Sequence, residues 1–188
     1  MGKLTFILGG ARSGKSQFAM QLAQNKSQDV CYVATALALD LEMQARISKH
    51  KADRPSQWKT IELNQNIAAQ LQDHNKAAKV MLLDCLTLLI SNIMLENCGD
   101  EENPNEVRVM LAIESETIAL LAMIEQSQAD WIVVSNEVGL GLVPPYPIGR
   151  LYRDILGKVN QLFAKAAQES YFMIAGIPIP LHRFGFTS

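Results

Sequence analysis

Eight residues near the amino terminus, "GGARSGKS", have the types and the spacing of a phosphate-binding loop. They occupy residues 9–16 and fit the pattern GxxxxGK[ST]. Glycines let the backbone wrap around phosphate oxygens, and a helix that begins at the loop directs its positive end at the same anion. In this pattern Lys15 reaches the β- and γ-phosphates, and the Ser16 hydroxyl is a ligand of Mg²⁺. The motif predicts a nucleoside triphosphate site but does not name the reaction.

Two carboxylates follow apolar segments further along the chain. "KVMLLD" ends in Asp84, which is the Walker B pattern and supplies the second Mg²⁺ anchor that phosphoryl transfer needs. "VVSNEVG" contains Glu137 at the end of another such segment. Glu137 could serve as a general base or support the metal site, or it could simply cap the following turn. Ser16 and Asp84 are therefore the predicted Mg²⁺ ligands.

A histidine lies among cations at the end of a predicted helix. Apolar residues recur at helical spacing in residues 39–51, which end in Ser-Lys-His-Lys and are followed by "ADRP". His50 therefore has Lys49, Lys51 and Arg54 as neighbours. Such cations suit a triphosphate and would favour a neutral, nucleophilic imidazole. The alternative is a bystander histidine at an exposed basic helix end, because cations are favourable there in any case.

The elements that must position these residues alternate between strand and helix. The predicted strands are residues 4–8, 29–35, 58–63, 79–84, 130–135 and 170–176, and the predicted helices are 15–26, 39–51, 64–75, 86–97, 105–127 and 149–168. Several strands are continuous apolar runs, which is typical of strands covered on both faces. The predicted fold class is α/β, a mainly parallel sheet with helices on both faces. At 188 residues we expect a single domain spanning 1–188.

Composition restricts the class of partner. The chain is 48% apolar and 19% charged with a formal charge of −2, so no broad basic surface for nucleic acid is expected. "VMLLDCLTLLISNIML" is interrupted by Asp84 and falls short of a membrane span. The three cysteines lack CxxC spacing, which favours a reducing, cytoplasmic location. His74 and His182 are isolated and are predicted to be surface residues, and we find no metal-ligand cluster.

The residues alone leave several functions open. Neither "NKSQ" nor "NKAA" continues to the Asp of the guanine-reading Asn-Lys-x-Asp motif, so a switch GTPase is excluded. A small-molecule P-loop kinase is the nearest alternative to an enzyme that also transfers nucleotides. A P-loop ATPase or recombinase-like DNA-binding module would require a basic stripe that this chain lacks. A non-catalytic nucleotide sensor is the remaining possibility.

Several segments together carry a family resemblance. "GGARSGKS", "YVATA", "EMQARISKHKADRP", "LLDCLTLLISN", "SNEVGLGLVP" and "GRLYRDILGKVNQ" span nearly the whole chain. With them the chain resembles the bifunctional adenosylcobinamide kinase / adenosylcobinamide-phosphate guanylyltransferase family. The resemblance implies that ATP or GTP phosphorylates adenosylcobinamide. GMP from GTP is then transferred to that phosphate through a guanylylated histidine, at the position of His50.

The resemblance also implies site residues, a cofactor and an assembly. His50 and Lys15 would be catalytic, Mg²⁺ would be the cofactor, and the sheet would contain one antiparallel strand in a homotrimer. Asp84 is left between metal ligation and nucleotide contact, and some relatives carry Glu there. The tail "IPIPLHRFGFTS" looks longer than the family's usual ending. The implied nucleotide contacts are Gly9, Gly10, Ala11, Arg12, Ser13, Gly14, Lys15, Ser16, Ala34, Thr35, Ala36, Lys51, Ala52, Asp53, Arg54, Glu62 and Asp84.

Overall fold

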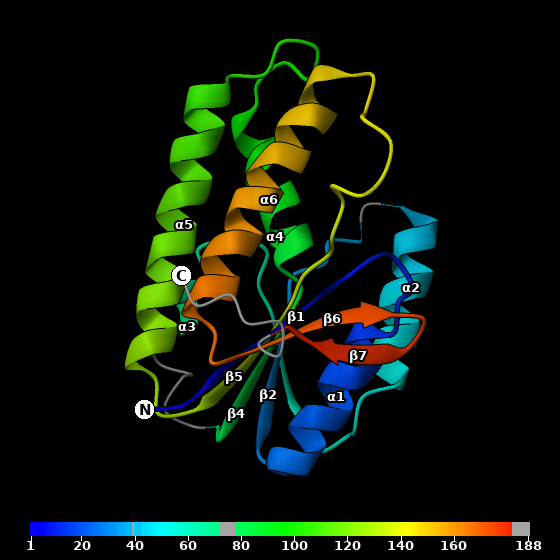
Figure 1. Cartoon of the computed structure of the whole chain (residues 1–188), viewed down its shortest axis with the longest axis vertical. Helices are drawn as coiled ribbons and strands as arrows, with labels where there is room; N and C mark the ends of the chain where they lie inside the picture. The colour runs from blue at the N-terminus through cyan, green and yellow to red at the C-terminus, as the bar shows by residue number, and fades with distance from the viewer. Residues whose placement is uncertain (39, 72–77, 182–188) are drawn as a thin grey trace.

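A computed structural model describes residues 1–38, 40–71 and 78–181 of the chain. Its strands and helices alternate as expected (Figure 1). The strands are β1 Leu4–Gly9, β2 Val30–Ala34, β3 Lys59–Glu62, β4 Val80–Asp84, β5 Asp130–Val134, β6 Glu169–Ile174 and β7 Ile177–Pro180. The helices are α1 Lys15–Lys26, α2 Leu41–Ala52, α3 Ile67–Leu71, α4 Leu86–Asn97, α5 Glu106–Gln126 and α6 Pro147–Ala166.

The seven strands form one sheet in the order β3-β2-β4-β5-β1-β6-β7. All neighbouring strands are parallel except β6 and β7, which are antiparallel. The mainly parallel sheet and its single antiparallel strand are therefore confirmed. Because parallel strands end at the same edge, the residues after β1, β2 and β4 are brought together there.

Helices cover both faces of the sheet, as predicted. One apolar core joins the sheet to α3, α4, α5 and α6, and a second joins its other face to α1. Figure 1 shows α1 and the α4–α5–α6 layer on opposite sides of the strands. The central strands are buried by both layers, which explains their continuous apolar sequences. By contrast, no described side chain of α2 is buried.

Two predicted segments differ from the structure. The helix predicted at 64–75 begins at Ile67 and is described to Leu71, and residues 72–77, with His74, lie outside the described residues. The tail that looked longer than the family's usual ending contributes β7, while 182–188, with His182, are again outside the described residues. Ala175 and Gly176 make the two-residue hairpin turn, with φ of 50° and 81°. Prolines at 178 and 180 are tolerated because β7 is an edge strand.

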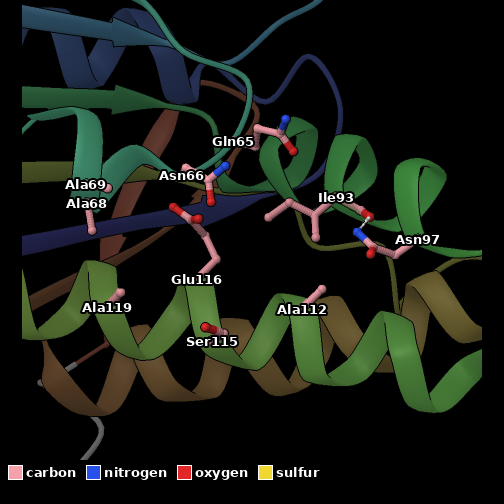
Figure 2. A pocket seen from close by; sticks show the side chains of 10 residues that line it. All are labelled: Gln65, Asn66, Ala68, Ala69, Ile93, Asn97, Ala112, Ser115, Glu116 and Ala119. Atoms are coloured by element: carbon pink, nitrogen blue, oxygen red, sulfur yellow. Dashed lines mark hydrogen bonds between the residues drawn. The ribbon is translucent and has the colours of Figure 1, made fainter.

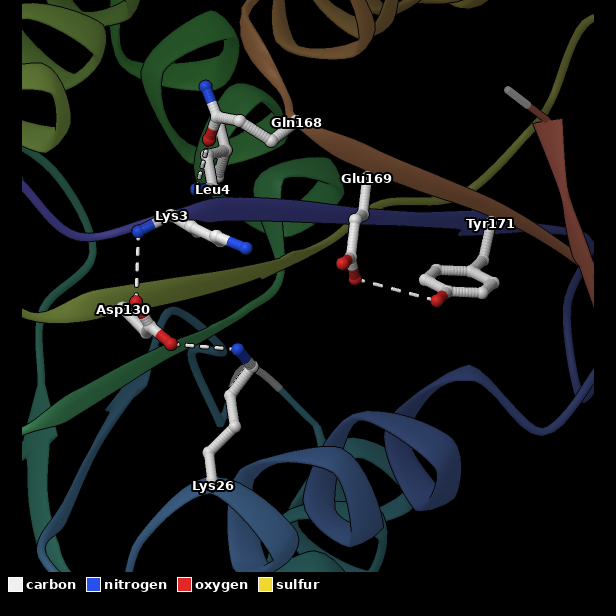
Figure 3. A network of polar contacts seen from close by, with 7 residues as sticks. All are labelled: Lys3, Leu4, Lys26, Asp130, Gln168, Glu169 and Tyr171. Atoms are coloured by element: carbon white, nitrogen blue, oxygen red, sulfur yellow. Dashed lines mark hydrogen bonds and ion pairs between the residues drawn. The ribbon is translucent and has the colours of Figure 1, made fainter. Parts of the chain in front are cut away.

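A polar network fastens the amino-terminal edge of the sheet, away from the phosphate loop (Figure 3). Asp130 accepts a hydrogen bond from the Lys3 backbone N–H at 2.9 Å and pairs with Lys26 Nζ at 2.7 Å. Partial burial alone would raise the pKa of Asp130. The Lys26 ammonium and the Lys3 N–H outweigh that burial and hold the pKa below its ordinary value. We therefore assign this polar network a role in stability and not in catalysis.

None of the helices in the described ranges has the length and apolar character needed to cross a membrane. The three cysteines are free and buried.

Candidate active site

The phosphate loop, residues 9–16, joins β1 to α1 as the motif predicts. Gly14 is the N-cap of α1 with φ of 95°, and no side chain caps the helix. The first N–H groups of α1 are therefore left to an anion. Arg12, with φ of 56°, is a second left-handed residue in the loop. Together these conformations turn the loop back over the start of the helix.

Lys15 is folded into this loop. Its Nζ donates to the Gly10 carbonyl at 2.6 Å and lies 3.5 Å from Ser13 Oγ. Burial lowers the pKa of Lys15, and the nearby Cys85 and Asp84 oppose that shift. Phosphate oxygens would supply the negative charge that the buried ammonium needs.

The β6–β7 hairpin packs against the phosphate loop and supports it. The Gly176 N–H donates to the Ser13 carbonyl at 3.0 Å. Gly9 lies so close to β6 that a Cβ there would be 2.6 Å from the Met173 carbonyl oxygen. Sequence reasoning missed this support, because Ala-Gly is not one of the pairs, such as Asn-Gly or Asp-Gly, that signal a two-residue hairpin turn.

Asp84 ends β4 at the same edge of the sheet. On β2, Ala34 is in register with Asp84 of β4 on one side and with Glu62 of β3 on the other. The Tyr32 hydroxyl donates to Asp84 Oδ2 at 2.7 Å, and burial raises the Tyr32 pKa so that the phenol stays protonated. Sequence reasoning read Tyr32 only as part of an apolar strand.

Thr35 fixes the backbone next to Asp84. Its hydroxyl donates to the Cys85 carbonyl at 2.7 Å and accepts from the Cys85 N–H at 2.9 Å. The Thr35 side chain is therefore occupied, and Ala34 and Ala36 on either side offer only main-chain polar atoms. Burial and the Asp84 charge raise the pKa of the Cys85 thiol to about 11, so it remains protonated.

The residues at this edge fit a bound Mg²⁺. Among the described residues no group of three or more His, Cys, Asp or Glu side chains could hold a metal alone. Mg²⁺ does not require such a cage, because it commonly takes one carboxylate, substrate phosphates and waters. Asp84 Oδ1 and the Ser16 hydroxyl are hard oxygen donors of this kind. In the described part of the chain, the hydrogen bond to Asp84 occupies only Oδ2.

A second group of predicted residues lies around β3 and the end of α2. Lys51 Nζ pairs with Glu62 Oε1 at 2.5 Å. Both side chains line a cavity of about 390 Å³. Its lining residues are Lys51, Arg54, Pro55, Ser56, Trp58, Thr60 and Glu62. Arg54 Cζ lies 3.6 Å from the centroid of the Tyr32 ring, so this cavity adjoins the Asp84 cluster.

His50 is in the last turn of α2 between Lys49 and Lys51, and its side chain is partly exposed. Ala52 ends the helix and Asp53 follows as its C-cap, both exposed. Among the described residues, no hydrogen bond or ion pair links His50 to the phosphate loop or to Asp84. The structure thus brings Lys51, Arg54 and Glu62 together, and in its described part no hydrogen bond or ion pair joins His50 to the triphosphate cradle.

Glu137 lies beside the loop without facing it. Its backbone N–H donates to the Gly9 carbonyl at 3.0 Å, while its Oε1 accepts from the Gly139 N–H at 2.5 Å. The carboxylate caps the turn after β5, which is the structural alternative left open by the sequence.

A further cavity of about 270 Å³ lies between α3, α4 and α5, away from these residues (Figure 2). Its one carboxylate, Glu116, accepts a hydrogen bond from the Ile67 N–H at 2.7 Å. Burial raises the pKa of Glu116, and backbone N–H groups at the start of α3 oppose that rise. Glu116 therefore anchors α3 to α5.

The fold and the site define a P-loop nucleotide-binding transferase. A family model described as "Cobinamide kinase / cobinamide phosphate guanyltransferase" matches residues 5–181. The chain belongs to this family. It is accordingly an enzyme with kinase and guanylyltransferase activity in cobalamin biosynthesis.

Individual relatives agree with the family match. The chain is 38% identical over 181 residues to the bifunctional adenosylcobalamin biosynthesis protein CobU of Escherichia coli, covering 95% of this chain and 99% of that protein. It is 41% identical over 175 residues to the CobP protein of the same description from Pseudomonas aeruginosa, covering 93% and 95%. A solved RadB recombinase matches with a TM-score of 0.50 at 13% identity, covering 91% of this chain and 74% of that one. That likeness shows the fold alone.

Proposed function

We propose that one site carries out both the kinase and the guanylyltransferase reaction. The phosphate loop binds the nucleotide in both, and His50 is the nucleophile only in the second. In the first, the γ-phosphoryl of ATP or GTP passes to the aminopropanol hydroxyl of adenosylcobinamide, which loses its proton as the nucleoside diphosphate leaves. In the second, His50 attacks the α-phosphorus of GTP and pyrophosphate leaves. A phosphate oxygen of adenosylcobinamide-phosphate then displaces the imidazole, forming adenosylcobinamide-GDP and regenerating His50.

One observation carries this proposal. Arg54, four residues after His50, packs on Tyr32, and Tyr32 bonds to Asp84 at the phosphate-loop edge. The histidine segment and the triphosphate cradle therefore adjoin one another. Kinase chemistry needs the γ-phosphate at the acceptor, whereas guanylylation needs the α-phosphorus at the histidine. We infer that α2 moves, or that GTP binds in a shifted pose, between the two reactions.

Lys15 has a role in both reactions. Its ammonium would exchange the Gly10 carbonyl for β- and γ-phosphate oxygens and stabilise charge there. The uncapped start of α1 contributes N–H donors to the same anion. Ser16 and Asp84 would hold Mg²⁺, which neutralises charge on the phosphates when it is bound.

The test uses GTP labelled at the α-phosphate. The wild-type protein should acquire an acid-labile label, as a phosphoramidate requires. His50→Asn should lose the label and guanylyl transfer while remaining folded and keeping kinase activity. His74→Asn and His182→Asn are matched controls that should be labelled normally. Label retained by His50→Asn would place the nucleophile elsewhere.

Two further parts of the proposal concern the corrinoid-binding surface and the assembly of subunits. The segment 136–150, a loop up to Tyr146 and then the start of α6, exposes Leu140, Leu142 and Val143 at the edge that holds the phosphate loop. We propose it as the lip of the corrinoid site.

Exposed Val107, Leu111 and Ile118 leave an apolar face on α5, which supports the homotrimer that the family resemblance implies. Light scattering at micromolar concentration should give three subunits, and a monomer would contradict this. Because the three cysteines are free thiols, we propose that the protein is located in the cytoplasm. We also propose that the chain is a single domain and has no nucleic-acid partner.

A further inference from the structure

Tyr32 is a buried tyrosine at a position where packing alone needs only a phenylalanine. It is 2% exposed and lies in the apolar core between the sheet and α1. Tyr32 pairs in register with Leu82, so Asp84 is its diagonal neighbour on the adjacent strand. Diagonal neighbours of this kind lie within reach of an aromatic side chain. The ring fills the core, and the hydroxyl serves the carboxylate.

The hydroxyl orients Asp84. It donates to Oδ2 at 2.7 Å, a charge-assisted bond that restrains rotation of the carboxylate. With Oδ2 held, Oδ1 is the oxygen directed away from the tyrosine. Removing the hydroxyl would free the carboxylate to turn.

The ring of the same side chain orients Arg54. The guanidinium carbon lies 3.6 Å from the ring centroid, a close cation–π contact. In the described part of the chain, the buried Nε and Nη1 of Arg54 have no hydrogen-bond partner. Arg54 as a whole is half-buried, and an anion in the adjoining cavity could satisfy these two buried donors. The Tyr32 ring therefore fixes the orientation of the Arg54 guanidinium, whose two buried donors a phosphate could bind.

We propose that Tyr32 is a positioning residue that orients Asp84 and Arg54 together, one through its hydroxyl and the other through its ring. This inference rests on the proposed function, in which Asp84 holds Mg²⁺, and it takes Arg54 as a nucleotide contact, as the family resemblance implies. In this proposal Tyr32 acts through Asp84 and Arg54, its two side-chain partners at this site. Its removal should therefore change how Mg²⁺ and nucleotide are bound more than it changes the fold.

The test measures nucleotide affinity by calorimetry, with and without Mg²⁺. Tyr32→Phe keeps the ring and removes the hydroxyl, so the gain in ATP affinity that Mg²⁺ provides should fall about tenfold, the effect of losing a hydrogen bond to a charged group. ATP affinity without Mg²⁺ should change less than about twofold. Tyr152→Phe is the matched control, because the hydroxyl it loses donates to the Thr87 carbonyl and not to a carboxylate.

A double-mutant cycle separates positioning from a general structural role. In an Asp84→Asn background, Tyr32→Phe should cause no additional loss of the Mg²⁺-dependent gain. Equal losses in both backgrounds, or a Tyr32→Phe protein that behaves like Tyr152→Phe, would overturn the inference. Wild-type behaviour of Asp84→Asn would overturn the assignment of Asp84 and this inference with it. If only the label experiment on His50 fails, the Tyr32 inference stands.

The ring is tested by Tyr32→Met, with thermal unfolding used to verify folding. Loss of the cation–π contact should lower GTP affinity without Mg²⁺ by about threefold beyond the effect of Tyr32→Phe. Equal affinities for the Phe and Met variants would show that the ring does not hold Arg54.

Discussion

The phosphate loop and helix α2, which we propose both act on the nucleotide, are held by the protein in different ways. The loop lies between the central strand β1 and α1, and the β6–β7 hairpin supports it. In α2 no described side chain is buried, and Lys51 pairs with Glu62 on the edge strand β3. A cradle that serves both reactions can be rigid. His50, as the proposed nucleophile of only one of them, would approach and withdraw, and weak packing permits such motion.

Lys15→Ala should have the largest effect, because both reactions share the cradle. We expect kinase turnover and label uptake by His50 each to fall by about 100-fold or more, as for loss of a preorganised charge at the phosphates. Rates at saturating nucleotide, with circular dichroism to check folding, would measure this. Normal kinase turnover in the folded variant would remove Lys15 from the cradle.

Gly9→Ala tests whether the cradle is rigid. The added Cβ would meet the Met173 carbonyl oxygen and Ser13 Oγ at under 3 Å, so we expect a loss of about 1–3 kcal/mol in unfolding free energy. Gly10→Ala is the matched control, because a Cβ there meets nothing within 4 Å. Urea unfolding would compare them. Equal stability of the two variants would mean that the loop yields easily.

Asp40→Ala tests the weak attachment of α2. Asp40 Oδ1 accepts from the Met43 N–H at 2.7 Å as the N-cap, and losing it should cost about 1 kcal/mol. Amide exchange in the first turn of α2 should then be about fivefold faster. Asn105→Ala removes the N-cap of α5 and should leave α2 unchanged. An α2 that exchanges as slowly as α1 in the wild type would abolish the contrast.

Asp130→Asn should have the smallest effect, because its pair with Lys26 lies at the opposite edge of the sheet and is partly exposed. We expect a loss below about 1 kcal/mol and unchanged label uptake. The folded-state pKa of Asp130 is lowered, so its stabilisation is present above the ordinary value of 3.8 and is lost as pH falls through the lowered value. Thermal unfolding at pH 7 and pH 3 should therefore show the difference shrinking at acid pH.

Much of the fold and the phosphate loop could be predicted from the sequence, because the patterns that indicate them lie within short segments. Continuous apolar strands and the loop motif at residues 9–16 predicted the sheet, its helical layers and the triphosphate cradle. β7 was missed because two prolines in four residues argue against a strand, and only its place at the sheet edge makes them acceptable.

Tyr32 shows the other limit of prediction. In "YVATA" it reads as one more apolar strand residue, since a strand pattern does not reveal which neighbour a side chain meets. Its bond to Asp84 depends on the register between β2 and β4, and its contact with Arg54 depends on the chain that follows α2. Such pairings are set by the tertiary fold. The position of His50 relative to the cradle has the same origin.

The hairpin that supports the phosphate loop has a consequence for the chain as it is synthesised. β1 pairs only with β5 and β6, and Ser13 receives its bond from Gly176. The triphosphate cradle is encoded near the amino terminus but is assembled only after the ribosome has passed residue 176. A nascent chain released before β6 would carry the complete loop motif and could contain β5, but it would lack β6 and the hairpin that supports the loop. Nucleotide retention would therefore distinguish finished chains from fragments that contain the same motif.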